Sequence, residues 1–170
     1  MLYIRTDANE TIATGHVMRC LTIAEKIREK KGKVCFLVSD ETSAALINKN
    51  KFEVIVTDVK WDSVNVEKEY QILKQKAKKT DWLLIDSYFI FSEYTAYMKT
   101  LLNVAVFDDM FSEKKIADMI INYNVFYRKF DYKSRYEHEK CKLLLGEKYV
   151  PLRQQFQQIE PEHGVRTDKY

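Results

Sequence analysis

The residues of this sequence best suited to chemistry are His16 and the polar side chains near it. Gly15, His16 and Arg19 stand at the start of a predicted helix, after a long polar loop that includes Asp7 and Glu10. The field at the first turn of a helix disfavours an imidazolium, so we expect the His16 ring to stay neutral near pH 7. A neutral imidazole accepts a proton from water, which is the step that general-base hydrolysis needs.

Each of these residues also has a structural interpretation. A lone histidine at such a position is more often a capping or packing residue than a catalytic one. Asp7 or Glu10 would orient the ring, and the sequence leaves both open. Gly15 lets the backbone turn tightly and approach a ligand. Arg19, one turn after His16, either binds a phosphate or sugar oxygen or is a solvated helix residue.

The elements that must position these side chains are short apolar runs separated by amphipathic stretches. The predicted strands are residues 2–4, 34–38, 54–56, 83–85, 104–107, 119–121 and 143–145. Their nearly continuous apolar character is typical of a parallel sheet buried on both faces. Helices are predicted over 15–31, 43–50, 64–79 and 92–101, with Gly32 as the left-handed cap of the first. The fold class is therefore α/β, a Rossmann-like, doubly wound, mostly parallel sheet of about seven strands.

Polar residues follow several of these strands, at the edge of the sheet where ligands of such folds bind. In chain order they are Asp86, Tyr88, Asp108, Asp109, Asn122, Asn124 and Tyr149. Asp and Asn also cap helices and form turns, which explains any one of them alone. Because several converge on one edge, we predict a binding site there. Of the two adjacent aspartates, we expect one to serve as a cap and the other to face the site.

Composition excludes several classes of protein. The 170 residues carry 28 basic and 25 acidic side chains, a net charge of +3. This excess is too small to indicate a nucleic-acid or membrane partner. Only 4 glycines are present, and we expect no glycine-rich phosphate loop. The spacing of His and Cys predicts no metal site, and we expect no cofactor. Without a signal peptide or membrane helix, the protein is expected to be cytoplasmic.

Five blocks of sequence occur in an order typical of one family. They are IRTD at 4–7 with IATGHVMR at 12–19, LIDSY at 84–88, VFDD at 106–109, ADMIIN at 117–122 and LGEKYVPLR at 145–153. Together they resemble the amino-terminal domain of the UDP-sugar hydrolases of pseudaminic acid biosynthesis. Spore-coat polysaccharide biosynthesis proteins are relatives, and the GT-B glycosyltransferase of peptidoglycan synthesis is more distant. The likeness covers residues 2–156.

The resemblance implies the N-terminal half of a GT-B architecture. Residues 1–153 would be the Rossmann-like catalytic half and 154–170 the start of an interdomain linker or tail, with the C-terminal nucleotide-binding half absent from this chain. His16 would activate water against the anomeric carbon of a UDP-linked amino sugar, a UDP-2,4-diacetamido-2,4,6-trideoxyhexose, with inversion and release of UDP. Substrate-binding roles are implied for Asp7, Gly15, Arg19, Asp86, Tyr88, Asp109, Asn122 and Tyr149.

Two positions depart from the family pattern, and other functions stay open. Ala13 stands where the family usually has glycine, and Ser87 stands where the pseudaminic acid enzyme has histidine, which weakens the assignment of the same sugar. The alternatives are a non-catalytic sugar-binding module and half of a GT-B glycosyltransferase. A flavodoxin-like or response-regulator-like domain fits less well, because the loop before His16 is long and no phosphate loop is present.

Overall fold

The computed structural model describes residues 1–8 and 14–157, in which a helix follows each strand except β5. The strands are β1 (Leu2–Thr6), β2 (Val34–Val38), β3 (Glu53–Val56), β4 (Trp82–Asp86), β5 (Asn103–Phe107), β6 (Met119–Asn122) and β7 (Lys142–Leu145). These seven form one all-parallel sheet in the order β3-β2-β1-β4-β5-β6-β7. The predicted α/β fold is confirmed, and every predicted strand is present.

The order of the strands reverses between β1 and β4, near the centre of the sheet. Leu2 of β1 pairs with Val34 of β2 on one side and with Trp82 of β4 on the other. The chain therefore builds one side of the sheet first and then crosses to the other side through α3. In sheets of this kind, the carboxyl ends of the strands on either side of the reversal are where ligands bind.

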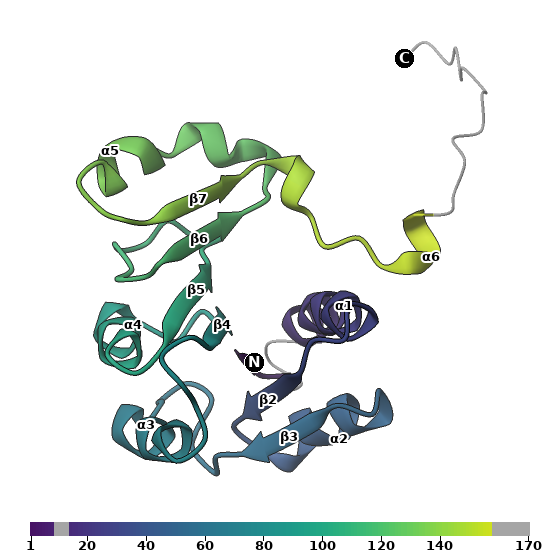
Figure 1. Cartoon of the computed structure of the whole chain (residues 1–170). Helices are drawn as coiled ribbons and strands as arrows, with labels where there is room; N and C mark the ends of the chain where they lie inside the picture. The colour runs from purple at the N-terminus through teal and green to yellow at the C-terminus, as the bar shows by residue number, and fades with distance from the viewer. Residues whose placement is uncertain (9–13, 158–170) are drawn as a thin grey trace, which may run out of the picture.

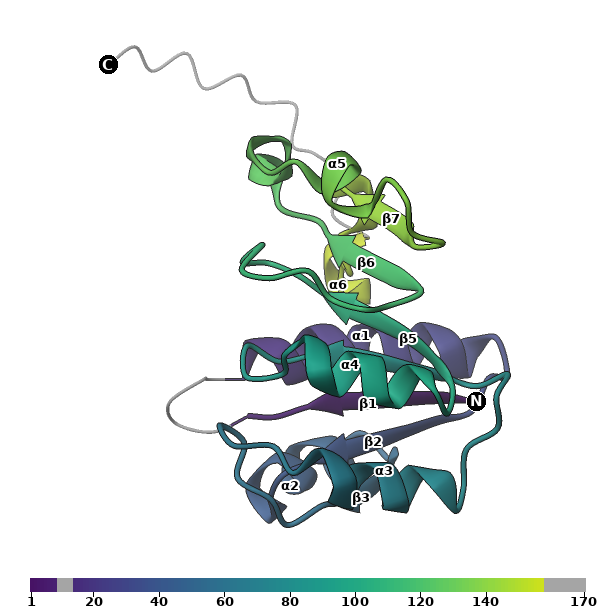
Figure 2. The same ribbon diagram turned by 90° about the vertical axis from the view of Figure 1, so that its left-hand side faces the viewer.

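Helices cover both faces of the sheet. They are α1 (Gly15–Glu29), α2 (Glu41–Lys49), α3 (Val66–Lys74), α4 (Ser92–Lys99), α5 (Tyr132–Tyr136) and α6 (Gln154–Gln157), with 3-10 turns at Val125–Lys129 and Glu147–Tyr149. Figure 1 shows α1 and α2 on one side of the sheet and α3 and α4 on the other. In Figure 2 the sheet is seen with α3 and α4 in front and α1 behind.

The core has two layers, one on each face of the sheet. Consecutive residues of a strand point to opposite faces, so Tyr3 and Ile4 of β1 belong to different layers. Ile4 is buried in the layer that contains Val17 of α1, whereas Tyr3 is buried in the layer that contains Leu73 of α3 and Met98 of α4. Each fully buried aliphatic side chain stabilises the fold by roughly 1.5–3 kcal/mol.

Side-chain caps explain where two helices differ from their predicted ranges. α2 begins two residues earlier than predicted, because the Asp40 side chain accepts a hydrogen bond from the Ser43 amide at 2.8 Å. α3 is shorter than the predicted range 64–79. It begins after Asn65, whose side chain accepts from the Lys68 amide at 2.9 Å. In both helices a polar side chain satisfies an amide that the first helical turn leaves unpaired.

The prediction that Gly32 is the left-handed cap of α1 is wrong. The residue with positive φ is Lys31, at 62°. The amide of Lys31 donates to the carbonyl of Arg28 and that of Gly32 to the carbonyl of Ile27, which is the pattern of a Schellman motif. Gly32 is required for space instead, since a Cβ there would lie 2.5 Å from Cγ2 of Ile27.

The carboxyl-terminal part of the chain is described only as far as residue 157. α6 forms where the sequence predicts the beginning of a helix, and residues 158–170 lie outside the described part. The domain boundary at residue 153 and the relation to a GT-B half stay predictions. None of the described helices has the length and apolar character needed to cross a bilayer.

Candidate functional site

The carboxyl ends of β1, β4 and β5 lie next to the first turns of α1. Thr6, the last residue of β1, pairs with Asp86, the last residue of β4. His16 and Arg19 lie on one face of α1, because residues three apart are neighbours on a helix. We use the name His16 cluster for the group of side chains that meet here, which are His16, Arg19, Asp86, Tyr88, Asp109 and Tyr123.

The His16 ring is hydrogen-bonded to the Asp86 carboxylate, with 2.5 Å between Nδ1 and Oδ1. The two side chains are 9% and 1% exposed. Burial would raise the pKa of Asp86, but hydrogen bonds and charge from Arg19 and His16 hold it below its usual value. The carboxylate is therefore ionised near neutral pH and only accepts hydrogen bonds. Nδ1 must then carry the proton, and Nε2 is the nitrogen that can take one from a ligand or water.

Arg19 connects four segments of the fold. Its Nε donates to Asp86 Oδ2 at 2.5 Å, and Nη2 donates to Asp86 Oδ1. Its Nη1 donates to Asp109 Oδ2 and to the Tyr123 hydroxyl, both at 2.8 Å. The guanidinium also lies 4.4 Å from the centre of the Phe107 ring. The interpretation of Arg19 as a solvated helix residue is wrong, because its side chain is 13% exposed. A direct contact with phosphate stays a prediction.

The two adjacent aspartates after β5, Asp108 and Asp109, have different hydrogen-bond partners. Asp109 binds Arg19 through Oδ2, while its Oδ1 is buried without a hydrogen-bond partner in the described part of the chain. Asp108 accepts a hydrogen bond from the Phe111 amide at 3.0 Å and so closes a turn. Burial raises the pKa of the Asp108 carboxyl. The prediction that one aspartate caps a helix is wrong, because Asp108 bonds an amide of a turn and no described helix begins there. Asp109 binds Arg19, and its contact with a ligand stays a prediction.

The aromatic ring of Tyr88 packs against the ring of His16. Its ring lies edge-on to the His16 ring, with centroids 4.6 Å apart and planes at 80°. Burial and the negative charge of Asp109 raise the pKa of the Tyr88 hydroxyl. The residue is nevertheless 50% exposed, so an aromatic face is open to solvent next to the buried acid–base pair. Such a surface suits the apolar face of a sugar or a nucleobase.

Asp7 lies in a different cluster from His16. Its Oδ1 accepts from the Ser39 amide at 2.6 Å, and its Oδ2 accepts from the Ser39 hydroxyl and from Arg5. The prediction that Asp7 orients the His16 ring is therefore wrong, because Asp86 occupies Nδ1. The other candidate, Glu10, lies outside the described residues.

Three further predicted site residues stand apart from the His16 cluster in their described contacts. Gly15 begins α1 without a positive φ, and a Cβ there would meet no described atom within 4 Å, while the predicted tight turn involves residues before Thr14 that lie outside the described part. Asn122 is fully buried, with its Nδ2 donating to the Tyr132 hydroxyl and its Oδ1 accepting from the Asn124 amide, each at 2.9 Å. Tyr149 lies in the 3-10 turn beyond β7. Ligand contacts of these residues stay predictions.

Sequence reasoning missed two parts of this region. Tyr123 follows a strand end, as the predicted site residues do, but nothing in the sequence shows that it binds Arg19. A buried ion pair also escaped notice: Arg5 Nε donates to both Glu69 carboxylate oxygens at 2.9 and 3.0 Å. Tyr94 donates to the same carboxylate at 2.6 Å. The signal for this pair is an arginine inside an apolar strand, which must find an acid when the strand is buried.

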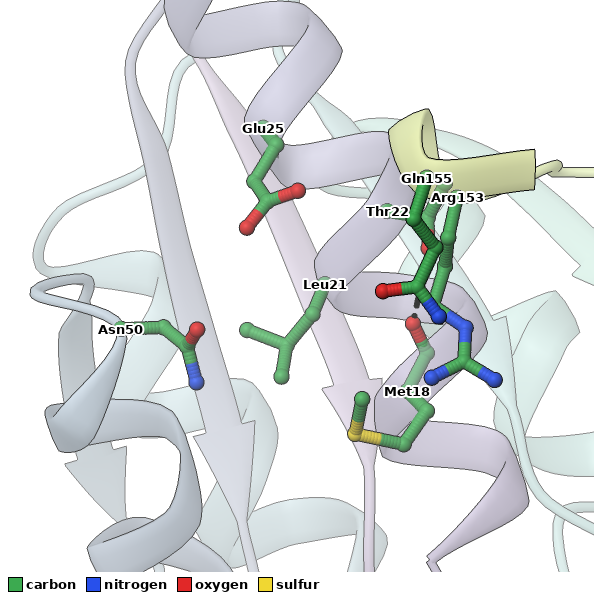
Figure 3. A pocket seen from close by; sticks show the side chains of 7 residues that line it. All are labelled: Met18, Leu21, Thr22, Glu25, Asn50, Arg153 and Gln155. Atoms are coloured by element: carbon green, nitrogen blue, oxygen red, sulfur yellow. Dashed lines mark hydrogen bonds between the residues drawn. The ribbon is translucent and has the colours of Figure 1, made fainter. Parts of the chain in front are cut away.

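The opposite face of α1 borders a cavity of about 500 Å³. Figure 3 shows the side chains that line it: Met18, Leu21, Thr22, Glu25, Asn50, Arg153 and Gln155. This cavity is separate from the His16 cluster, because residues 18, 21, 22 and 25 lie on the side of the helix away from His16 and Arg19. Within the described ranges, His, Cys, Asp and Glu side chains form no group of three or more that could hold a metal ion.

The sheet order and the helices on both faces define a Rossmann-like parallel α/β protein. No family model matches the chain. It is similar to the uncharacterized protein MJ1062 of Methanocaldococcus jannaschii, with 29% identity over 169 residues, which cover 96% of this chain and 33% of that protein. The chain therefore spans about a third of the length of this relative.

Proposed function

We propose that this chain is the catalytic half of a nucleotide-sugar hydrolase and that His16 is its general base. The observation that carries the proposal is the hydrogen bond between His16 Nδ1 and Asp86 Oδ1, at the reversal of strand order. An ionised aspartate on one ring nitrogen directs proton transfer to the other and stabilises the imidazolium that forms. This arrangement is typical of enzymes that activate an oxygen nucleophile.

The chemistry needs one proton acceptor and one leaving group. The oxygen of a water molecule would attack the anomeric carbon while Nε2 of His16 takes the proton. The bond between the anomeric carbon and the diphosphate oxygen would break, and UDP would leave with the bonding electrons. Attack from the side opposite to the leaving group inverts the configuration at carbon. Arg19 would compensate the charge of Asp86 throughout this step, and the imidazolium that forms on His16 would add to this compensation.

The proposed substrate class is a UDP-2,4-diacetamido-2,4,6-trideoxyhexose. It follows from the resemblance of the five sequence blocks to the hydrolases of pseudaminic acid biosynthesis. Tyr88 would place an aromatic face against the sugar beside His16. A C-terminal nucleotide-binding half would hold most of the UDP in a GT-B arrangement. Ser87 stands at the position of the histidine of that family, between Asp86 and Tyr88.

Release of UDP tests the proposal when this chain is joined to a nucleotide-binding half. We expect His16→Ala to lower turnover by about 10²- to 10⁴-fold, the usual contribution of a general base. The unfolding midpoint should change little, because Arg19 still holds Asp86 in place. His138→Ala is the matched control, since His138 is an exposed histidine, and it should keep full activity. Unchanged release of UDP in His16→Ala would remove His16 from the mechanism.

The fate of the sugar separates hydrolysis from transfer. In a glycosyltransferase half, the same base would deprotonate a hydroxyl of an acceptor instead of water. Free sugar formed together with UDP, in the absence of an acceptor, supports the hydrolase. UDP formed only when an acceptor is added supports the transferase. Sugar binding without any release of UDP supports the non-catalytic sugar-binding module.

A further inference from the structure

Arg19 contacts both members of the proposed acid–base pair. It donates two hydrogen bonds to the Asp86 carboxylate, through Nε and Nη2. The same Nη2 lies 3.3 Å from Nδ1 of His16. The planar guanidinium matches the plane of the carboxylate, so it fixes the orientation of Asp86 as well as its charge.

The charges around His16 explain why a cation is needed at this point. Asp86 is 1% exposed, and an ionised carboxylate at that depth requires a positive partner. Arg19 supplies this charge, and Asp109 and Tyr123 hold the guanidinium from the other side. Among the described contacts of Asp86, the group besides Arg19 that can become positive is the His16 ring. A ring that is already protonated cannot act as a base.

We propose that Arg19 is a positioning residue that supplies the counter-charge of Asp86 and thereby keeps the His16 ring in its neutral, proton-accepting form. This inference rests on the proposed role of His16 as general base. Among the described residues, the ionisable groups that contact the ring are Asp86 from β4, Tyr88 from the loop after it and Arg19 from α1, and Asp109 lies behind Arg19, bound to its Nη1. Of these, Asp109 opposes Arg19, because its negative charge favours the imidazolium.

A purely structural role for Arg19 makes a different prediction. If the guanidinium only connected α1 to β4 and β5, its removal would lower stability without changing the protonation of His16 in the molecules that remain folded. The ratio of imidazolium to neutral imidazole therefore separates the two roles. This ratio is measured by ¹⁵N and ¹³C NMR of the histidine ring at pH 7. The 170-residue chain is sufficient, and no substrate is needed.

Four variants test the proposal. We expect Arg19→Met to raise the imidazolium ratio of His16 by about tenfold or more, since a full charge beside the ring is lost. Arg19→Lys should restore most of the wild-type ratio, because it returns the charge without the planar geometry. Asp109→Asn should shift the ratio in the opposite direction. Arg28→Met is the matched control on the same helix, where Arg28 stacks on Phe52, and it should leave the ratio unchanged.

The outcomes can be assigned to the inference or to the proposed function. An unchanged ratio in a folded Arg19→Met protein overturns the inference. If that variant does not fold, Asp109→Asn decides, and a ratio that stays the same or rises overturns the inference. The expected shifts, together with an intact enzyme that never releases UDP, would leave the inference standing and reject the hydrolase proposal.

Discussion

At the level of single residues, Arg5 and Arg19 have different roles. Arg5 lies inside β1 with no solvent exposure and binds Glu69, Asp7 and Ser39. Burial would lower the pKa of Arg5, but Glu69 and Asp7 raise it above its usual value, so the guanidinium stays charged. The partners of Arg5 lie directly after β2, on α3 and directly after β1, so Arg5 holds these segments together. Arg19 instead holds a carboxylate next to an ionisable ring.

Glu69 provides a prediction for the Arg5 network. Replacing Glu69 with Gln should lower the free energy of unfolding by about 3–5 kcal/mol, because it leaves a buried guanidinium without its main counter-charge. Urea unfolding followed by circular dichroism measures this change. Glu67→Gln is the control on the same helix, since Glu67 is exposed, and it should have little effect. Equal effects of the two substitutions would contradict a special role for the buried pair.

At the level of elements, α1 holds His16 and Arg19 in its first turns and is followed by Lys31, which has a positive φ. His16 and Arg19 lie one turn apart, so the helix fixes their relative position before any partner is present. The sequence therefore allowed both residues to be predicted as neighbours. Their partners come from β4 and from the loops after β5 and β6. Asp86 lies 67 residues after Arg19 in the sequence, and Asp109 and Tyr123 lie 90 and 104 residues after it. The order of the strands brings these segments together.

The end of α1 gives a prediction for a pair of neighbouring positions. Lys31→Gly should stabilise the protein by about 0.5–1 kcal/mol, because glycine adopts the positive φ of this position without steric cost. Gly32→Ala should destabilise it by about 1–3 kcal/mol, since the new methyl group would collide with the branched side chain of Ile27. Thermal unfolding of both variants measures these opposite effects. Stabilisation by Gly32→Ala would show that the turn relaxes around the methyl group.

At the level of the whole molecule, the ionised carboxylates determine how stability depends on pH. Burial opposes ionisation of Asp81, Asp86 and Glu113, but hydrogen bonds and nearby cations lower the pKa of each in the folded state. A lowered pKa stabilises the fold above the pKa of the unfolded chain, and this stability is lost as the pH falls through the folded value. Asp108, whose pKa is raised by burial, acts in the opposite sense.

We therefore expect the free energy of unfolding to change little between pH 7 and 5 and to fall below about pH 4. Asp81→Asn should make this fall smaller, because Asp81 accepts a hydrogen bond from the amino terminus at 2.7 Å. Asp58→Asn is the control, since the Asp58 side chain is 98% exposed. Urea unfolding at a series of pH values provides the measurement. A protein that becomes more stable on acidification to pH 3 would contradict the assignment of these carboxylates.

The sequence by itself determined the seven strands, the presence of α1, α2, α3 and α4, and the ends of strands that polar residues follow. These features depend on local properties, namely apolar runs, helical spacing and capping residues, and each is readable within a short segment. The assignment of His16 and Arg19 to one helical face is of the same kind.

The tertiary structure decided which aspartate pairs with Arg5, His16 and Arg19. Asp7 follows β1 and is close to His16 in the sequence. In the structure, however, Asp7 binds Arg5, and His16 is hydrogen-bonded to Asp86. It also placed Arg19 on Asp86 rather than in solvent. Pairings of this kind depend on the order of the strands and on the face of the sheet or helix from which each side chain projects. His16 and Asp86 are seventy positions apart, and no local pattern in the sequence indicates that they are in contact.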